Sequence, residues 1–270
     1  MVVDTSAQER LQRDLERLER FRVLDDTFMR QVFKDNLPLA QQVLRIITGI
    51  GDLELVCEET QRDLKRLAGS RSVALDVFGK GADGEQYDLE VQTGSDLEPL
   101  RFRYYGSAMD VDRLKAGSDY SKLPERWVVV VLEEDPDGAE RAARHYSTKD
   151  EDGSELGDGT HLLYANASYR GDNEFGRLMA DFCERDPDAI RNPLMRERVQ
   201  YLKRDPKGVA QMCKISEEIY NEGVKQGMEQ GIVRSVRSLA EKTGVGVAEA
   251  LGLLDVPESE RPKYLELLRA

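Results

Sequence analysis

Residues 71–93, RSVALDVFGKGADGEQYDLEVQT, carry the clearest indication of the architecture of this chain. Within it, residues 72–79 and 87–93 alternate apolar with polar side chains, a pattern that predicts β-strands. The segment between them is rich in Gly and Asp, as is usual in the longer loops of β-hairpins. The stretch therefore predicts an antiparallel hairpin with one side in a core. That side carries Val73, Leu75, Val77, Tyr87, Leu89 and Val91.

The other side of the predicted hairpin is acidic. Alternate residues of a strand lie on the same side of the sheet. The acidic side carries Asp76, Asp88, Glu90 and Gln92. If the hairpin is symmetric about its turn, Asp76 pairs with Glu90. The same symmetry pairs Phe78 with Asp88.

Asp76 and Glu90 form a candidate metal site. Opposite residues of an antiparallel pair have Cβ atoms roughly 4.5 to 5.5 Å apart, so the two carboxylates would repel each other. A divalent cation reverses that effect, because hard cations such as Mg²⁺ take carboxylate oxygens, water and phosphate as ligands. The alternative is a solvated sheet face, on which a register shift of two residues keeps the acids apart.

An Asp in one strand and Glu-x-Gln in the next resembles the core of the PD-(D/E)XK nuclease superfamily, with Gln92 in the place usually held by Lys. The surrounding sequence is similar to the PD-(D/E)XK nuclease family transposases, which are related to the recombination-promoting nucleases. The likeness covers residues 24–214. It rests on the segments DDTFMRQVFKDNLPLAQQVLRIITG, TQRDLKRLAGSRSVALDVFG, YDLEVQ, RYYGSAMDVDRLKAGSDYSKLPE and YLKRDPKGVAQMCK.

This resemblance implies an α/β fold with a restriction-endonuclease-like mixed sheet flanked by helices. It also implies a metal-dependent DNA endonuclease of the type linked to recombination or mobile elements. Mg²⁺ or Mn²⁺ would be held by Asp76, Glu90 and the main-chain carbonyl of Val91. Gln92 would orient the attacking water or a phosphate oxygen through its amide, which offers hydrogen bonds but no charge.

Asp25 has two interpretations. It precedes a predicted helix that carries Phe28, Met29, Val32 and Phe33, and Asp is a good N-cap residue, as Asp26 would be. In the resembled family an acid from an N-terminal helix joins the metal shell, and the match places Asp25 in that position. Both interpretations remain open at this point.

The charge distribution limits how DNA could bind. The net charge of −13 disfavours nucleic acid as a partner, because phosphate contacts come from Lys and Arg. Basic residues nevertheless gather on both sides of the hairpin. The candidate DNA-binding residues are Lys65, Arg66, Arg101 and Arg103. Lys65, Arg66 or Arg101 could also supply the positive charge that Gln92 lacks.

The rest of the chain predicts helices around one buried strand. Residues 127–132, WVVVVL, are typical of a strand buried on both faces, and residues 52–58 predict a further strand. Residues 97–115 predict a helix. Its expected buried side carries Leu97, Leu100, Tyr104, Ser107, Val111 and Leu114.

We expect three parts: an N-terminal helical arm (residues 1–23), a nuclease-like domain (24–205) and a helical C-terminal tail (206–270). Glycines recur every four residues in the tail, a spacing that suits self-association into a homo-oligomer.

No run approaches the ~20 apolar residues that span a bilayer, which predicts no membrane partner. The first residues lack an apolar signal region, which predicts a cytoplasmic location. Three scattered cysteines and two histidines predict neither a disulfide framework nor a His-rich metal cluster.

Two other functions remain alternatives to the nuclease. The first is a catalytically silent nuclease fold that binds DNA or protein, which the acidic net charge and Gln92 favour. The second makes the helical tail the working part, assembling oligomers. Retention of both Asp76 and Glu90 favours an active enzyme.

Overall fold

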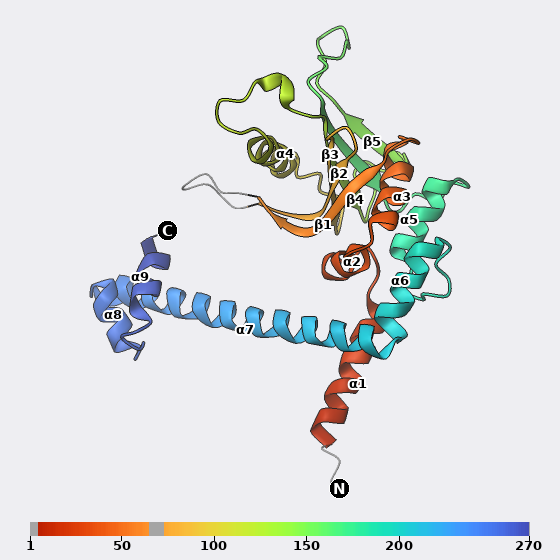
Figure 1. Ribbon diagram of the computed structural model, residues 1–270. Helices are drawn as coiled ribbons and strands as arrows, with labels where there is room; N and C mark the ends of the chain where they lie inside the picture. The colour runs from red at the N-terminus through yellow and green to blue at the C-terminus, as the bar shows by residue number, and fades with distance from the viewer. Residues whose placement is uncertain (1–4, 65–72, 270) are drawn as a thin grey trace. The chain divides into compact units, whose positions relative to one another are not determined.

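The computed structural model describes residues 5–64 and 73–269, and its core is a six-stranded mixed sheet (Figure 1). The strand order is β1-β2-β3-β4-β6-β5. β2 pairs antiparallel with β1 on one side and with β3 on the other. β3, β4 and β6 run parallel, and β5 returns antiparallel to β6. The strands are β1 (Leu55–Asp63), β2 (Ala74–Gly81), β3 (Gln86–Gln92), β4 (Arg126–Leu132), β5 (Ala143–Tyr146) and β6 (Thr160–Asn166).

Helices cover both faces of this sheet. Figure 1 shows α4 on one side, with α3, α5 and α6 on the other. This arrangement confirms the predicted α/β class with a mixed sheet flanked by helices. The helices of this part are α1 (Thr5–Arg20), α2 (Asp26–Phe33), α3 (Leu37–Thr48), α4 (Pro99–Arg113), the 3₁₀ turn η1 (Tyr120–Lys122), α5 (Glu174–Cys183) and α6 (Pro193–Arg204).

The predicted hairpin forms, with its strands displaced slightly along the chain. β2 runs to Gly81 and β3 begins at Gln86, so the turn is shorter than expected. β4 is almost wholly buried, as the WVVVVL run predicts. The strand expected at residues 52–58 corresponds to β1, which begins later, at Leu55, and ends later, at Asp63. β1 extends this far because its pairing with β2 continues to Asp63, opposite Ala74.

The predicted buried side of α4 is wrong. Leu100 is 67% exposed, whereas Phe102, Gly106 and Met109 face the sheet. Phe102 and Met109 pack in one apolar cluster with residues of β2 and β4. Gly106 between them leaves room for the guanidinium group of Arg126, which donates to Asp110 of the same helix.

The chain divides into two compact units, Met1–Val209 and Ala210–Ala270. The second unit has its own small core of Val236, Ala250, Leu251, Val256 and Tyr264. Its elements are the C-terminal part of α7 (Pro206–Thr243), α8 (Val247–Leu253) and α9 (Arg261–Arg269). Across the described residues, no helix combines the length and apolar character needed to cross a membrane.

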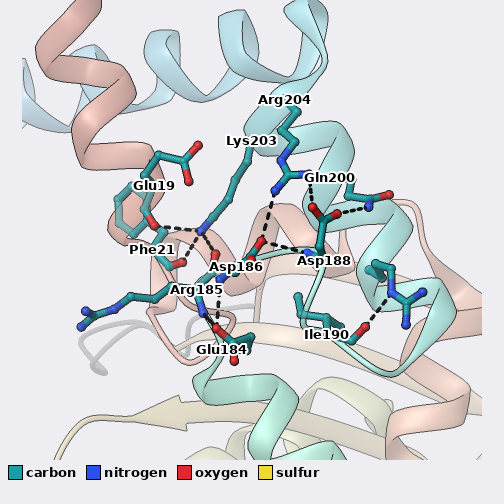
Figure 2. Close-up of polar contacts among 11 residues, drawn as sticks. Glu19, Phe21, Glu184, Arg185, Asp186, Asp188, Ile190, Gln200, Lys203 and Arg204 are labelled. Carbon is teal, nitrogen blue, oxygen red and sulfur yellow. Dashed lines mark hydrogen bonds and ion pairs between the residues drawn. The ribbon is translucent and has the colours of Figure 1, made fainter.

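One buried lysine joins three separated segments of the first unit (Figure 2). Lys203 of α6 is 3% exposed, and its Nζ donates to the main-chain oxygens of Glu19 (3.1 Å), Phe21 (2.7 Å) and Arg185 (2.6 Å). Burial lowers the pKa of Lys203. The ammonium thus uses all three of its donors on carbonyls from the end of α1 and the loop after α5.

Candidate active site

The hairpin register brings the two predicted metal ligands together. Phe78 pairs with Asp88, as expected, and Val77 pairs with Leu89. One residue further along, the main-chain N–H of Asp76 donates to Oε1 of Glu90 at 3.0 Å. The strands therefore separate just where the two acids meet, and a side chain replaces the next ladder bond.

The acids of this hairpin are buried. Asp88 is 0% exposed and Glu90 1%, while the Asp76 side chain is 15% exposed. α4 covers this side of the sheet, since Phe102 and Met109 pack in one apolar cluster with residues of β2 and β4. The alternative of a solvated acidic face is therefore wrong.

Burial also sets the protonation of the cluster. It is the largest cause that raises the pKa of Glu90, followed by the charges of Asp88 and Asp76. Burial first, and then the charge of Asp26, raises the pKa of Asp76 to about 6. Burial, with the charge of Asp76 next, raises the pKa of Asp88 well above its ordinary value. Glu90 consequently keeps a proton near neutral pH when no cation is bound.

Two arginines reach the acids, and each is shared with another carboxylate. Nη2 of Arg101 lies 3.5 Å from Oε2 of Glu90, while its Nη1 contacts Glu98 at 3.0 Å. Nε of Arg30 lies 3.6 Å from Oδ1 of Asp76 and donates to Oδ1 of Asp26 at 2.7 Å. Among the described residues, carboxylates therefore outnumber arginines around the pair.

Asp25 is engaged elsewhere. Its carboxylate accepts from the main-chain N–H of Arg22 at 2.7 Å and from Nη2 of Arg22 at 3.1 Å. It occupies the N-cap position of α2 without a capping side-chain bond. The neighbouring Asp26 is instead linked to Asp76 through Arg30, a link that the Asp26–Arg30 spacing of four residues could have indicated.

The other predicted site residues differ in surroundings. Nε2 of Gln92 donates to the main-chain oxygen of Asp96 at 2.6 Å, whereas its buried Oε1 has no hydrogen-bond partner. Val91 lies opposite Val131 in the parallel ladder. Arg103 is exposed on α4. Lys65 and Arg66 lie outside the described residues.

Three residues of the site have no role in the sequence-based prediction. Asp88 lies on the predicted acidic side, and both of its carboxylate oxygens are buried without a hydrogen-bond partner. Arg30 of α2 contacts Asp76, and Tyr105 of α4 is the third. Nε of Arg101 donates to Oη of Tyr105 at 3.2 Å, which places that ring beside the acids as well.

We expect Asp88→Asn to stabilise the metal-free protein at high pH. The raised pKa of Asp88 means that the folded state prefers the protonated acid. The associated stability is full below the unfolded pKa of about 4 and is lost as the pH rises. The variant should match the wild type near pH 4 and exceed its unfolding free energy by about 1 kcal/mol or more near pH 8. Urea denaturation of the wild type and the variant in EDTA measures the unfolding free energy at each pH. Identical pH profiles of the two proteins would contradict the expectation.

A cavity of about 570 Å³ opens beside β1. Its lining comprises Lys34, Asp35, Glu58, Glu59, Thr60, Gln61, Arg62, Asp63 and Asp112. Burial is the main cause that raises the pKa of Glu58 there to about 7. None of the predicted site residues that the structure describes lines this cavity, so it is a feature distinct from the Asp76–Glu90 pair.

Within the described ranges, no group of three or more His, Cys, Asp and Glu side chains is arranged to hold a metal ion. No protein-family model, curated protein or solved structure matches the chain.

Proposed function

We propose that this protein is a metal-dependent DNA endonuclease whose sheet is a restriction-endonuclease-like core of the PD-(D/E)XK type. The observation that carries the proposal is the contact of Asp76 with Glu90 at the point where β2 and β3 separate. The mixed sheet with helices on both faces is compatible with such a core. The link to recombination or mobile elements rests on the sequence resemblance.

The residues present fit a divalent cation. Carboxylate oxygens are the ligands that Mg²⁺ and Mn²⁺ prefer, and two of them with water and phosphate suffice for Mg²⁺. Asp88 adds two buried oxygens without a hydrogen-bond partner close to the pair. Asp76, Glu90 and the carbonyl of Val91 would hold the ion. When bound, it supplies a water of lowered pKa and neutralises charge that grows on the phosphate.

Each remaining side chain of the site has its own task. Glu90 would hold the cation as an ionised carboxylate, since a ligating carboxylate must be ionised. Gln92 orients water or a phosphate oxygen with an amide that is already anchored on Asp96. Arg101, 41% exposed and in contact with Glu90, supplies the positive charge that Gln92 lacks.

A catalytically silent module that binds DNA or protein is the second candidate. Its supporting observation is the raised pKa of Glu90, because a carboxyl group that stays protonated resists cation binding. The net charge of −13 points the same way. The two candidate functions differ in whether an added divalent cation produces DNA cleavage and raises the thermal stability of the protein.

Plasmid nicking is the test that separates them. We expect the purified protein to nick or cut DNA with Mg²⁺ or Mn²⁺ but not in EDTA. Asp76→Ala and Glu90→Ala should each abolish the reaction. Equal cleavage by the wild type and both variants would identify a contaminating nuclease. Absence of cleavage, together with no thermal stabilisation by Mn²⁺, would favour the silent module.

A further inference from the structure

The chain's two histidines lie side by side on the outer strands of the sheet. Nε2 of His145 in β5 is 2.9 Å from Nδ1 of His161 in β6. Both rings stack on the indole of Trp127 in β4, with centroid distances of 4.0 Å for His161 and 5.1 Å for His145. The two imidazoles therefore share one aromatic support that fixes their planes.

This pair is separate from the carboxylate site. Trp127 pairs with His161, whereas Val130 of the same strand lies opposite Glu90. Residues three apart in a strand face opposite sides of a sheet. The histidines and the Asp76–Glu90 pair accordingly occupy different faces.

The far nitrogen of His161 has an acidic neighbour. Oε2 of Glu125 lies 3.7 Å from Nε2 of His161, so its charge favours the tautomer with the proton on Nε2. That tautomer turns the lone pair of Nδ1 toward His145. Burial lowers the pKa of His161 most, the charge of His145 lowers it further, and Glu125, Asp158 and Glu155 raise it. The imidazole is thus neutral at physiological pH in acidic surroundings, which is the form that binds metals.

We propose that His145 and His161 together bind one divalent transition-metal ion, of the Ni²⁺ and Cu²⁺ class, between these two nitrogens. On binding, the proton that His145 carries on Nε2 moves to its Nδ1, so that both imidazoles stay neutral and each turns a lone pair to the ion, and water fills the other positions of the ion. Glu125 acts as a positioning residue through His161, in the manner of the carboxylates that orient metal-bound imidazoles.

The separation of the nitrogens selects the kind of ion. At the ~2.1 Å that is usual between a metal and an imidazole nitrogen, an ion would subtend about 90° between two atoms 2.9 Å apart. Adjacent ligands of square-planar or octahedral ions meet at that angle, while tetrahedral zinc requires a wider one. The site therefore favours Ni²⁺ or Cu²⁺ over Zn²⁺ without movement of the strands.

Trp127 is the only tryptophan in the chain and reports on this site directly. Titration of the full chain, prepared without a polyhistidine tag, with Ni²⁺ should quench its fluorescence to saturation at one ion per chain. His145→Gln and His161→Gln should each raise the half-saturating concentration by at least about tenfold, because one of two nitrogen ligands is lost. Glu125→Gln should raise it less, and Mg²⁺ should leave the fluorescence unchanged.

Thermal unfolding gives a second measurement. Ni²⁺ should raise the melting temperature of the wild type and not that of the His145→Gln/His161→Gln double variant. His145 is exposed on the edge strand β5 and the His161 side chain is 20% exposed at the start of β6, so neither substitution removes a buried core residue. Unquenched fluorescence in the wild type would overturn the proposal. Equal quenching and stabilisation in the double variant would also overturn it and leave the histidines as a hydrogen-bonded pair.

Discussion

Asp76→Asn and Glu90→Gln are each expected to lower the rate of Mg²⁺-dependent DNA cleavage by about 10²- to 10³-fold. A bound cation contributes several kcal/mol of transition-state stabilisation, and each substitution removes a charged ligand while keeping its shape. Single-turnover cleavage of a labelled duplex with saturating protein measures the chemical step. Glu98→Gln is the matched control, since Glu98 shares Arg101 with Glu90 but is 41% exposed.

The same substitutions should raise the folding stability of the metal-free protein, although they lower the cleavage rate. The pKa of Glu90 is raised in the folded state, so its stabilising effect is present below about pH 4.5 and is lost as the pH rises. Glu90→Gln should therefore unfold at higher urea concentration than the wild type near pH 8 in EDTA. Lost cleavage together with lowered stability would indicate misfolding and contradict the assigned role. Loss of cleavage in Glu98→Gln would show that the assay responds to any charge change near Arg101.

Lys203→Met should lower the unfolding free energy by about 3 kcal/mol or more. The substitution keeps a long apolar side chain but removes the donor for the carbonyls of Glu19, Phe21 and Arg185, and a buried acceptor left without a donor costs about 1 to 3 kcal/mol. Urea denaturation of the full chain measures the change. Lys207→Met is the matched control: Lys207 is exposed at the start of α7, four residues further along the chain, so we expect a change within about 0.5 kcal/mol.

The other polar contacts of that region should matter far less. Arg204 contacts Asp186 at 3.1 Å and Asp188 at 2.7 Å, but all three side chains are about half exposed (Figure 2). Exposed ion pairs contribute little because water and salt screen them. A Lys203→Met variant with a stability loss no larger than that of the Lys207 variant would show that water satisfies the three carbonyls.

Local patterns were sufficient to predict the hairpin and its acids. Alternation and the Gly-Asp turn located both strands, and symmetry about the turn placed Asp76 against Glu90. Alternation specifies which side of a strand a residue occupies but not what covers that side. The burial of Asp88 therefore could not be predicted, since it depends on α4 lying over the acids.

Long-range packing accounts for the remaining differences. The apolar residues of α4 offer more than one side at helical spacing, and packing against side chains of β2 and β4, which are distant in sequence, decides between them. Lys203 contacts Glu19, which is 184 residues away in sequence. The pairing of His145 with His161 likewise follows from strand order, for which the sequence carries no local signal.

The Lys203 ammonium also determines where the chain could be shortened. The helical arm predicted for residues 1–23 includes Glu19 and Phe21, which supply two of the three acceptors for an almost fully buried ammonium group. Leu18 is 3% exposed as well. A truncated protein that starts at Leu24 would keep the ammonium group of Lys203 but lose two of its three hydrogen-bond acceptors, the main-chain oxygens of Glu19 and Phe21. Any trimming for expression or crystallisation should therefore stop upstream of Leu18.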